Sequence, residues 1–308
     1  MSGSPPFGSS DNSGTSLASR QHRGRLISAL LLILAMLGLG ALLYPQASDW
    51  YARRGHDAEI SGYVRQIDAT PEAGRREALD RARQYNAEIP EGVLQDPFTT
   101  VTDTLGSDYL NQLSAPGTEM MAELTYPELG MSLPIYHGTA EDVISSGVGH
   151  LKGSSLPVGG PSTRSVLTSH SGLVHAELFT RLPEAKEGDV FHISVQGEAF
   201  YYRVNAIETV LPHQTASLKV VNGEDLVTLI TCTPIGVNSH RLFVHAERID
   251  APAGDTGRAL AGDGLVAGFP WWLVLFLGGS VLATYLIYTP PRSSGKHRLT
   301  TAQGVSQQ

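Results

Sequence analysis

The sequence predicts a mainly β domain, either a closed barrel or a sandwich, that follows a helical region and is flanked by two transmembrane helices. After about Glu119, short β-branched and aromatic runs alternate with Gly, Pro, Asn and Ser, which is typical of many short strands. Residues 49–87, by contrast, are charge-rich and have a helical pattern. Two long apolar stretches without charged residues lie near the two ends of the chain.

The helical region is expected to contain two helices, residues 49–68 and 71–87. Between them, Thr70-Pro71-Glu72 combines an N-cap residue, a proline at the first helical position and an acidic first turn. In the β region, a hairpin turn is expected at Gly197-Glu198, with small helical insertions at residues 141–146 and 175–180. The expected strands are residues 120–125, 129–133, 164–169, 189–195, 199–210, 226–232 and 241–249.

The two apolar stretches, residues 26–45 and 269–288, are each long enough to span a bilayer, which takes about 20 helical residues. The positive-inside rule places both termini in the cytoplasm and residues 46–267 outside. A cleaved signal peptide is the alternative for the first stretch. Pro45, at the minus-three position of the best cleavage candidate, fits the small-x-small pattern poorly, so we favour a retained anchor. The flanking basic residues are Arg20, Arg23, Arg25, Arg292, Lys296 and Arg298.

The segment expected outside the membrane is acidic. Residues 46–267 contain 16 Lys+Arg against 29 Asp+Glu, a net charge of −13 with neutral histidines. No basic stripe is available to neutralise phosphates, which argues against nucleic acid as a partner. The histidines are scattered and the chain has no HExxH or CxxC pattern, so the sequence predicts no metal or other cofactor.

Cys232 is the only cysteine of the chain, so it has no intrachain partner for a disulfide. It ends the apolar run 227–232, and Thr233-Pro234 then breaks the strand, so the side chain is expected at a strand end. Taken alone, the residue is equally consistent with a nucleophile and with a small buried core residue.

Two side chains are candidate partners of this thiol. Arg241 begins the next strand; if the two strands are neighbours, it approaches Cys232 and favours a thiolate or a developing oxyanion. The alternative is a surface charge at a strand start. His170 follows the apolar run 166–169 at another strand end and is the best placed of the eleven histidines for proton transfer.

These segments resemble the sortases, transpeptidases that attach proteins to Gram-positive surfaces. Residues 228–232 (TLITC) match the family's TLxTC motif, and Arg241 stands where its arginine follows the cysteine. Residues 167–173 (LTSHSGL) resemble its histidine segment, with Ser169 and Ser171 where many members have glycine and arginine. The similarity spans about residues 93–250 and extends to the double-anchored layout. Stretches that resemble the class C, pilus-building branch are 133–138, 147–151 and 156–160.

The resemblance implies a sortase-like eight-stranded β-barrel with short helical insertions, and a mechanism without a cofactor. In it, Cys232 attacks the Thr–Gly bond of an LPxTG-type sorting motif and forms a thioacyl-enzyme. His170 protonates the leaving amine and accepts a proton from the incoming one. Arg241 holds the substrate or stabilises the oxyanion. The implied partners are pilin or surface proteins with such motifs, and in the pilus-building branch the acceptor is a pilin lysine.

Asp96-Pro97-Phe98 matches the Asp-Pro-aromatic lid motif found before the barrel in many pilus-building sortases. An aspartate can pair with Arg241 while an aromatic ring covers the thiol, and Pro97 stiffens the loop between them. The resemblance therefore implies that Asp96 and Phe98 occupy the site in the resting enzyme. Without it, an ordinary Asp-Pro turn is the simpler interpretation.

The resemblance also divides the chain into segments. The expected order is a cytoplasmic tail (1–25), a transmembrane helix (26–45), a helical region (46–92), a lid and connector (93–117), a catalytic barrel (118–250), a linker (251–268), a second transmembrane helix (269–288) and a cytoplasmic tail (289–308).

Three other functions are consistent with the sequence. A cell-wall-anchoring sortase would use the amine of a peptidoglycan precursor in place of lysine. A membrane-tethered scaffold or adhesin would simply bury Cys232, whereas an exported cysteine protease would transfer the acyl group to water. The identity of the acceptor separates the sortases from each other and from the protease. Replacing Cys232 would abolish the activity of either sortase or of the protease, whereas it would leave a scaffold unaffected.

Overall fold

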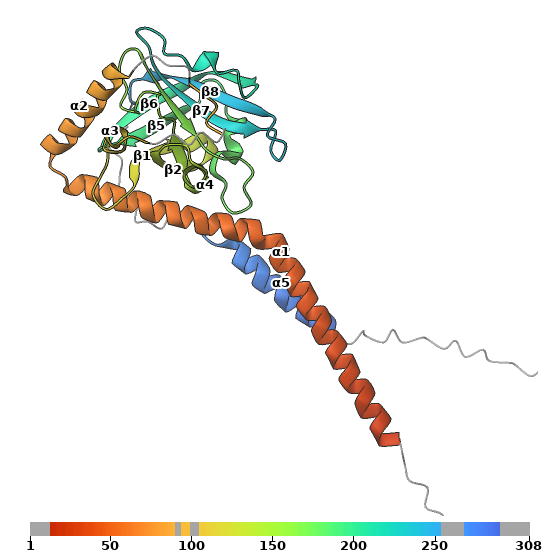
Figure 1. Cartoon of the computed structure of the whole chain (residues 1–308). Coiled ribbons are helices and arrows are strands. Elements are labelled where there is room, and N and C mark those ends of the chain that lie inside the picture. Colours follow the sequence, from red (N-terminus) through yellow and green to blue (C-terminus); the bar gives the residue numbers. More distant parts are fainter. Residues whose placement is uncertain (1–12, 90–93, 99–104, 254–267, 290–308) are drawn as a thin grey trace, which may run out of the picture. The chain divides into compact units, whose positions relative to one another are not determined.

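The computed structural model describes residues 13–89, 94–98, 105–253 and 268–289. It divides into two compact units, one reaching to Tyr44 and resuming at Trp271, the other spanning Pro45–Pro270. The second unit contains a closed barrel of eight described strands in the order β1-β2-β3-β4-β7-β8-β6-β5 (Figure 1), which confirms the predicted fold class. The strands are β1 Met120–Tyr126, β2 Met131–His137, β3 Val148–His150, β4 Thr163–Thr168, β5 Val190–Val195, β6 Glu198–Val210, β7 Asp225–Thr233 and β8 His240–Ile249.

Seven of these strands match expected strands, and the boundary differences have local causes. β3 was not expected because three residues with a central glycine show neither alternation nor β-branched enrichment. The strand expected at 129–133 begins two residues later, because Pro127–Leu129 form the 3₁₀ turn η1, which ends at Gly130 with a φ of 61°. The insertion expected at 175–180 is the 3₁₀ segment η2, Leu178–Glu184.

The helices differ from expectation at Pro45. The sequence predicts a membrane helix and a separate helix at 49–68, whereas the structure has one continuous helix, α1, that includes Pro45. A proline removes one backbone hydrogen bond, but a helix can continue past it with a bend when both flanks are strongly helical. The helices are α1 Ser13–Ala69, α2 Glu72–Glu88, α3 Ser107–Leu110, α4 Glu141–Ser146 and α5 Trp271–Tyr288, and a third 3₁₀ turn, η3, is Ala216–Leu218.

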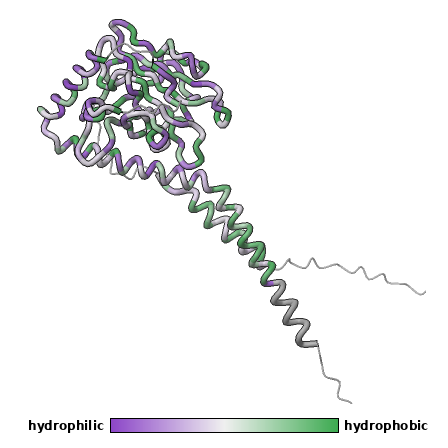
Figure 2. Tube along the Cα trace, viewed as in Figure 1, coloured by the Kyte–Doolittle hydropathy of each residue, from purple (hydrophilic) through white to green (hydrophobic). Residues whose placement is uncertain are grey.

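Two of the described helices are long and apolar enough to cross a membrane, α1 over Arg25–Ala69 and α5. Figure 2 shows hydrophobic residues along both apolar stretches. Within the first unit, Gly279 of α5 lies against Leu39 of α1, where an added Cβ would be 2.7 Å from the leucine side chain. Such small residues let apolar helices approach closely.

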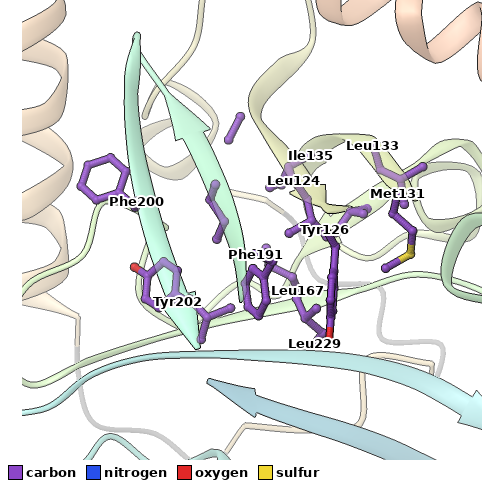
Figure 3. Packing of buried hydrophobic residues seen from close by; sticks show 14 of the residues in the cluster. Leu124, Tyr126, Met131, Leu133, Ile135, Leu167, Phe191, Phe200, Tyr202 and Leu229 are labelled. Atoms are coloured by element: carbon purple, nitrogen blue, oxygen red, sulfur yellow. The ribbon is translucent and has the colours of Figure 1, made fainter. Parts of the chain in front are cut away.

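Three aromatic rings pack together in the largely aliphatic core of the barrel. The ring of Phe191 lies between those of Tyr126 and Tyr202, with centroids 5.4 and 5.9 Å apart (Figure 3). Each tyrosine hydroxyl donates a hydrogen bond to a carboxylate, Tyr126 to Asp189 at 2.8 Å and Tyr202 to Asp225 at 3.2 Å. The rings are therefore buried without leaving an unpaired hydroxyl, and they join β1, β5 and β6 inside the barrel.

The helical region packs on the outside of this barrel. The hydroxyl of Tyr63 in α1 donates to the backbone oxygen of Met121 at 3.2 Å and accepts from the amide of Gln196 at 3.1 Å. The side chain of Asn86 in α2 makes two hydrogen bonds with the backbone of Leu156, of 3.1 and 2.7 Å. Both helices therefore belong to the folded unit.

Gly149 of β3 permits a close approach of the chain before α4. A Cβ at this position would overlap the backbone oxygen of Gly138 and lie 2.9 Å from Ile144 Cγ2. We expect Gly149→Ala to lower the free energy of unfolding by about 1–3 kcal/mol, the usual effect of overpacking. Denaturant unfolding of the full chain measures the change. The matched control is Gly55→Ala in α1, which meets no atom within 4 Å and should be neutral or slightly stabilising. Equal stability of the two variants would contradict this account.

Candidate active site

Strands β7 and β8 are antiparallel neighbours, and their register places Cys232 directly opposite Arg241. Alternation along β7 sends Val227 and Leu229 into the barrel core and leaves Ile230 and Cys232 on the outer face. The cysteine is only 6% exposed. The cation and the thiol thus meet on the outside of the barrel.

His170 lies two residues beyond the end of β4, on a loop that hydroxyl groups hold in place. Ser169 Oγ donates to the backbone oxygens of Gly147 and Ile144 at 2.5 and 3.2 Å. Ser171 Oγ donates to the backbone oxygen of Cys232 at 2.7 Å, which ties the histidine loop to the end of β7. The two serines that depart from the sortase pattern therefore bind buried carbonyl oxygens. The sequence did not indicate this role, because all three carbonyls belong to other segments of the chain.

The side chain of His170 pairs with a carboxylate that the sequence analysis missed. His170 Nε2 lies 2.9 Å from Glu141 Oε1 at the start of α4, and the histidine side chain is 20% exposed. No sequence pattern links these two residues, which are 29 positions apart. A carboxylate in this position orients the imidazole through its Nε2 atom.

The segment before the barrel covers this site. Arg241 donates two hydrogen bonds to Asp96, from Nε to Oδ1 and from Nη2 to Oδ2, both of 2.8 Å. Both residues are buried, at 8% and 7% exposure. The ring of Phe98 lies 5.0 Å from the Arg241 guanidinium and 5.7 Å from the His170 ring. Pro97 between them is also buried. Asp96 and Phe98 thus contact two of the three candidate catalytic residues.

The electrostatics of the closed site oppose formation of the thiolate. Burial raises the pKa of the Cys232 thiol; the positive charge of Arg241 opposes this rise, and the negative charges of Asp96 and Glu141 add to it. Asp96 also forms an ion pair with Arg241, the cation opposite Cys232. In this arrangement Cys232 carries its proton at neutral pH. In the part of the chain that the structure describes, no group of three or more His, Cys, Asp or Glu side chains is arranged to hold a metal.

Comparisons with known proteins identify the family of this chain. The Sortase domain family matches residues 124–249. Sortase A of Streptococcus agalactiae is 26% identical over 139 residues, which are 44% of this chain and 56% of that protein, so the chain spans little more than half of this relative. Among solved structures, sortase C-1 of Actinomyces oris is 46% identical with a TM-score of 0.55, covering 57% of this chain and 99% of that one. Sortase C of Streptococcus pneumoniae is 38% identical with a TM-score of 0.56, covering 60% and 94%. The chain belongs to the sortase family.

The pKa of the thiol is the measurable consequence of the closed site. In an Asp96→Ala, Phe98→Ala variant, the sulfur loses its cover and Arg241 acts on it without an opposing carboxylate, so the pKa falls. Because the thiolate forms above the pKa, the pH midpoint of alkylation moves to lower pH. A fall of one unit raises labelling at pH 7 about tenfold. Labelling by iodoacetamide across pH 6–10, read by intact mass, measures this shift.

Adding Arg241→Gln to that variant is the control, and it should move the midpoint back to higher pH. Identical labelling curves for wild type and the double variant would show that Asp96 and Phe98 do not cover the thiol in solution.

Proposed function

We propose that this protein is a class C sortase anchored in a membrane. It is a cysteine transpeptidase that cleaves an LPxTG-type sorting motif and joins pilin subunits through isopeptide bonds to a lysine. The observation that carries the proposal is the pair of Cys232 and Arg241 across β7 and β8, beside the His170 loop and beneath Asp96 and Phe98. Two similar proteins support the pilus-building branch: the S. pneumoniae sortase C is described in terms of pilin substrate specificity, and a Group B Streptococcus sortase C as pilus-related.

In the first half-reaction, the Cys232 sulfur attacks the carbonyl carbon of the threonine as its proton passes to His170. The carbon–nitrogen bond to glycine breaks, His170 returns the proton to the leaving amine, and a thioester remains on Cys232. Once Asp96 has left, the Nε–H and Nη2–H groups of Arg241 are free to bind the developing oxyanion.

In the second half-reaction, an uncharged amine attacks the thioester. The amine loses a proton to His170, an amide bond forms, and the thiol of Cys232 is restored when it takes a proton back. Glu141 supports both steps because it holds the imidazole in place on its Nε2 side. With a pilin lysine as acceptor, the product is an isopeptide-linked polymer.

Asp96-Pro97-Phe98 acts as a lid in this proposal. The Asp96 carboxylate occupies the donor groups of Arg241 that the substrate needs, and Phe98 covers the adjacent apolar surface. The lid therefore has to move before acylation. Residues 118–250 form the catalytic barrel, 93–117 the lid and connector, 46–92 a helical support and 251–268 the linker to the second span.

The membrane arrangement is part of the proposal. The span 26–45 lies in α1, and the span 269–288 contains α5; these are the two described helices that are long and apolar enough to cross a bilayer. Basic residues precede the first span and follow the second, which supports both termini in the cytoplasm and residues 46–267 outside the cell.

A wall-anchoring sortase is the second candidate. Its acyl-enzyme would be the same, and its acceptor would be the amine of a peptidoglycan precursor. This candidate is supported by the similarity of the chain to two proteins named sortase A, one from S. agalactiae and one from Corynebacterium diphtheriae (42% identical). Only the acceptor distinguishes the two.

The direct test is intact mass spectrometry of the full chain in detergent after incubation with an LPxTG peptide. We expect an acyl adduct that is stronger in the Asp96→Ala, Phe98→Ala variant and absent from Cys232→Ala. Adding a lysine peptide or a wall-peptide amine should then release the adduct as an amide, and the more efficient amine identifies the branch. Release as free acid at the same rate with and without amine would favour a protease. If the folded chain forms no adduct with several motif variants, the enzyme proposal is rejected and the scaffold is favoured.

A further inference from the structure

The outer face of the barrel continues beyond the candidate site as a row of side chains. On β7 the row passes from Cys232 over Ile230 to Thr228. Ile230 belongs to a buried apolar cluster with Val166 of β4 and Phe243 of β8. At Thr228 the row becomes polar. Thr228 lies four residues before Cys232 on the strand, which at about 3.3 Å per residue places it about 13 Å away. The candidate catalytic residues and a separate polar group thus lie at opposite ends of one apolar strip.

Arg164 of β4 is a buried cation at this polar end, only 6% exposed. Its Nε donates to the backbone oxygen of Lys219 and its Nη1 to Thr228 Oγ1, both at 2.9 Å, and His245 Nδ1 lies 3.2 Å from the same Nη1. None of these partners is an anion. Among the described residues, no carboxylate lies within ion-pair distance of Arg164, although the carboxylates of Glu224 and Glu208 act on it from further away. A buried guanidinium without an adjacent anion favours a ligand that supplies one.

Arg164 lines a cleft of about 1170 Å³ between the end of α2, the β3–β4 connection and the β6–β7 connection. The described lining also includes Arg83, His213 and Lys219, and it contains no aspartate or glutamate. This is unexpected in residues 46–267, where acids outnumber bases by 29 to 16. Arg83 has two acidic partners, Asp80 of its own helix at 3.0 Å and Glu198 of β6 at 3.9 Å, whereas Lys219 makes no ion pair with any described residue. The cleft is therefore complementary in charge to an acidic peptide.

The spacing connects the cleft to the reaction. Counting back from the threonine of an LPxTG motif, the fourth residue is the one before leucine. In an extended peptide acylated on Cys232, this residue lies about 13 Å away, the separation between Cys232 and Thr228. The proline and leucine then lie over Ile230 and its apolar neighbours. Leu94 packs on this apolar cluster and also lines the cleft, so a substrate in this path displaces the segment that carries the lid.

We propose that the cleft around Arg164 and Lys219 binds acidic side chains in the substrate segment that directly precedes the sorting motif. The inference rests on the proposed function and adds to it a preference for carboxylates at the two positions before the leucine. Arg164 is the buried anchor, and Lys219 and Arg83 supply exposed positive charge at the rim of the cleft.

The test compares two fluorescent peptides that carry the same LPxTG motif, one preceded by two glutamates and one by two glutamines. Binding is measured by anisotropy on the full chain in detergent, with Cys232→Ala to prevent turnover and Asp96→Ala, Phe98→Ala to open the site. We expect the glutamate peptide to bind at least about threefold more tightly, as one or two partly exposed ion pairs allow. The preference should shrink as salt rises.

Adding Lys219→Gln and Arg83→Gln should remove most of the preference. The matched control is Lys186→Gln with Arg76→Gln. It also removes one lysine and one arginine charge, but from residues outside the described cleft lining, and it should leave the preference intact. Equal affinity for both peptides, or binding of neither, overturns the inference.

Acylation of the chain without the Cys232→Ala change separates this result from the proposed function. Acyl adducts from both peptides at equal rates would keep the transpeptidase and reject the acidic subsite. Preferential binding of the glutamate peptide without any adduct would reject the transpeptidase and keep the cleft as an acid-binding surface.

Discussion

The in-register pairing of β7 with β8 is the constraint on which the candidate site depends. It places Cys232 opposite Arg241 on the outer face, while the alternate residues of β7 fill the barrel core. A slip of one residue would turn the thiol into the core and separate it from the cation. Closure of the barrel and the aromatic stack around Phe191 make such a slip costly, so the core of the fold sets the geometry of its surface.

The buried pair of Asp96 and Arg241 extends this constraint to the segment before the barrel. Burying two charges costs desolvation free energy, which two parallel charge-assisted hydrogen bonds offset in a fork geometry. The same geometry makes the pair replaceable, because another oxygen acceptor can take the place of the Asp96 carboxylate. Under the proposed function, closed-site stability and substrate recognition use the same donors of Arg241. This explains how one short segment can both protect a buried thiol and yield to a ligand.

The three elements that meet at the site are joined mainly by hydroxyl groups. Ser169 binds the chain around α4, Ser171 binds the end of β7, and Thr231 Oγ1 donates to the backbone oxygen of Ser169 at 2.9 Å. Each bond pairs a buried carbonyl oxygen that would otherwise destabilise the fold. His170 is thus held by its neighbours in the chain, and its imidazole remains able to exchange partners.

The sequence by itself determined the mainly β class, seven of the eight strands, both apolar spans, and Cys232, His170 and Arg241 as candidates. These features follow from local periodicity, charge and motif spacing, which each segment carries alone. Local patterns left barrel and sandwich open, and the resemblance to sortases implied the eight-stranded barrel that the structure has. Only the tertiary structure included the three-residue β3, brought Glu141 to His170 and buried Arg164 beside Thr228. The physical reason is that alternation reports which face of a strand is buried but not which strand lies beside it. Contacts such as Asp96 with Arg241, 145 positions apart, exist only once packing has closed the barrel.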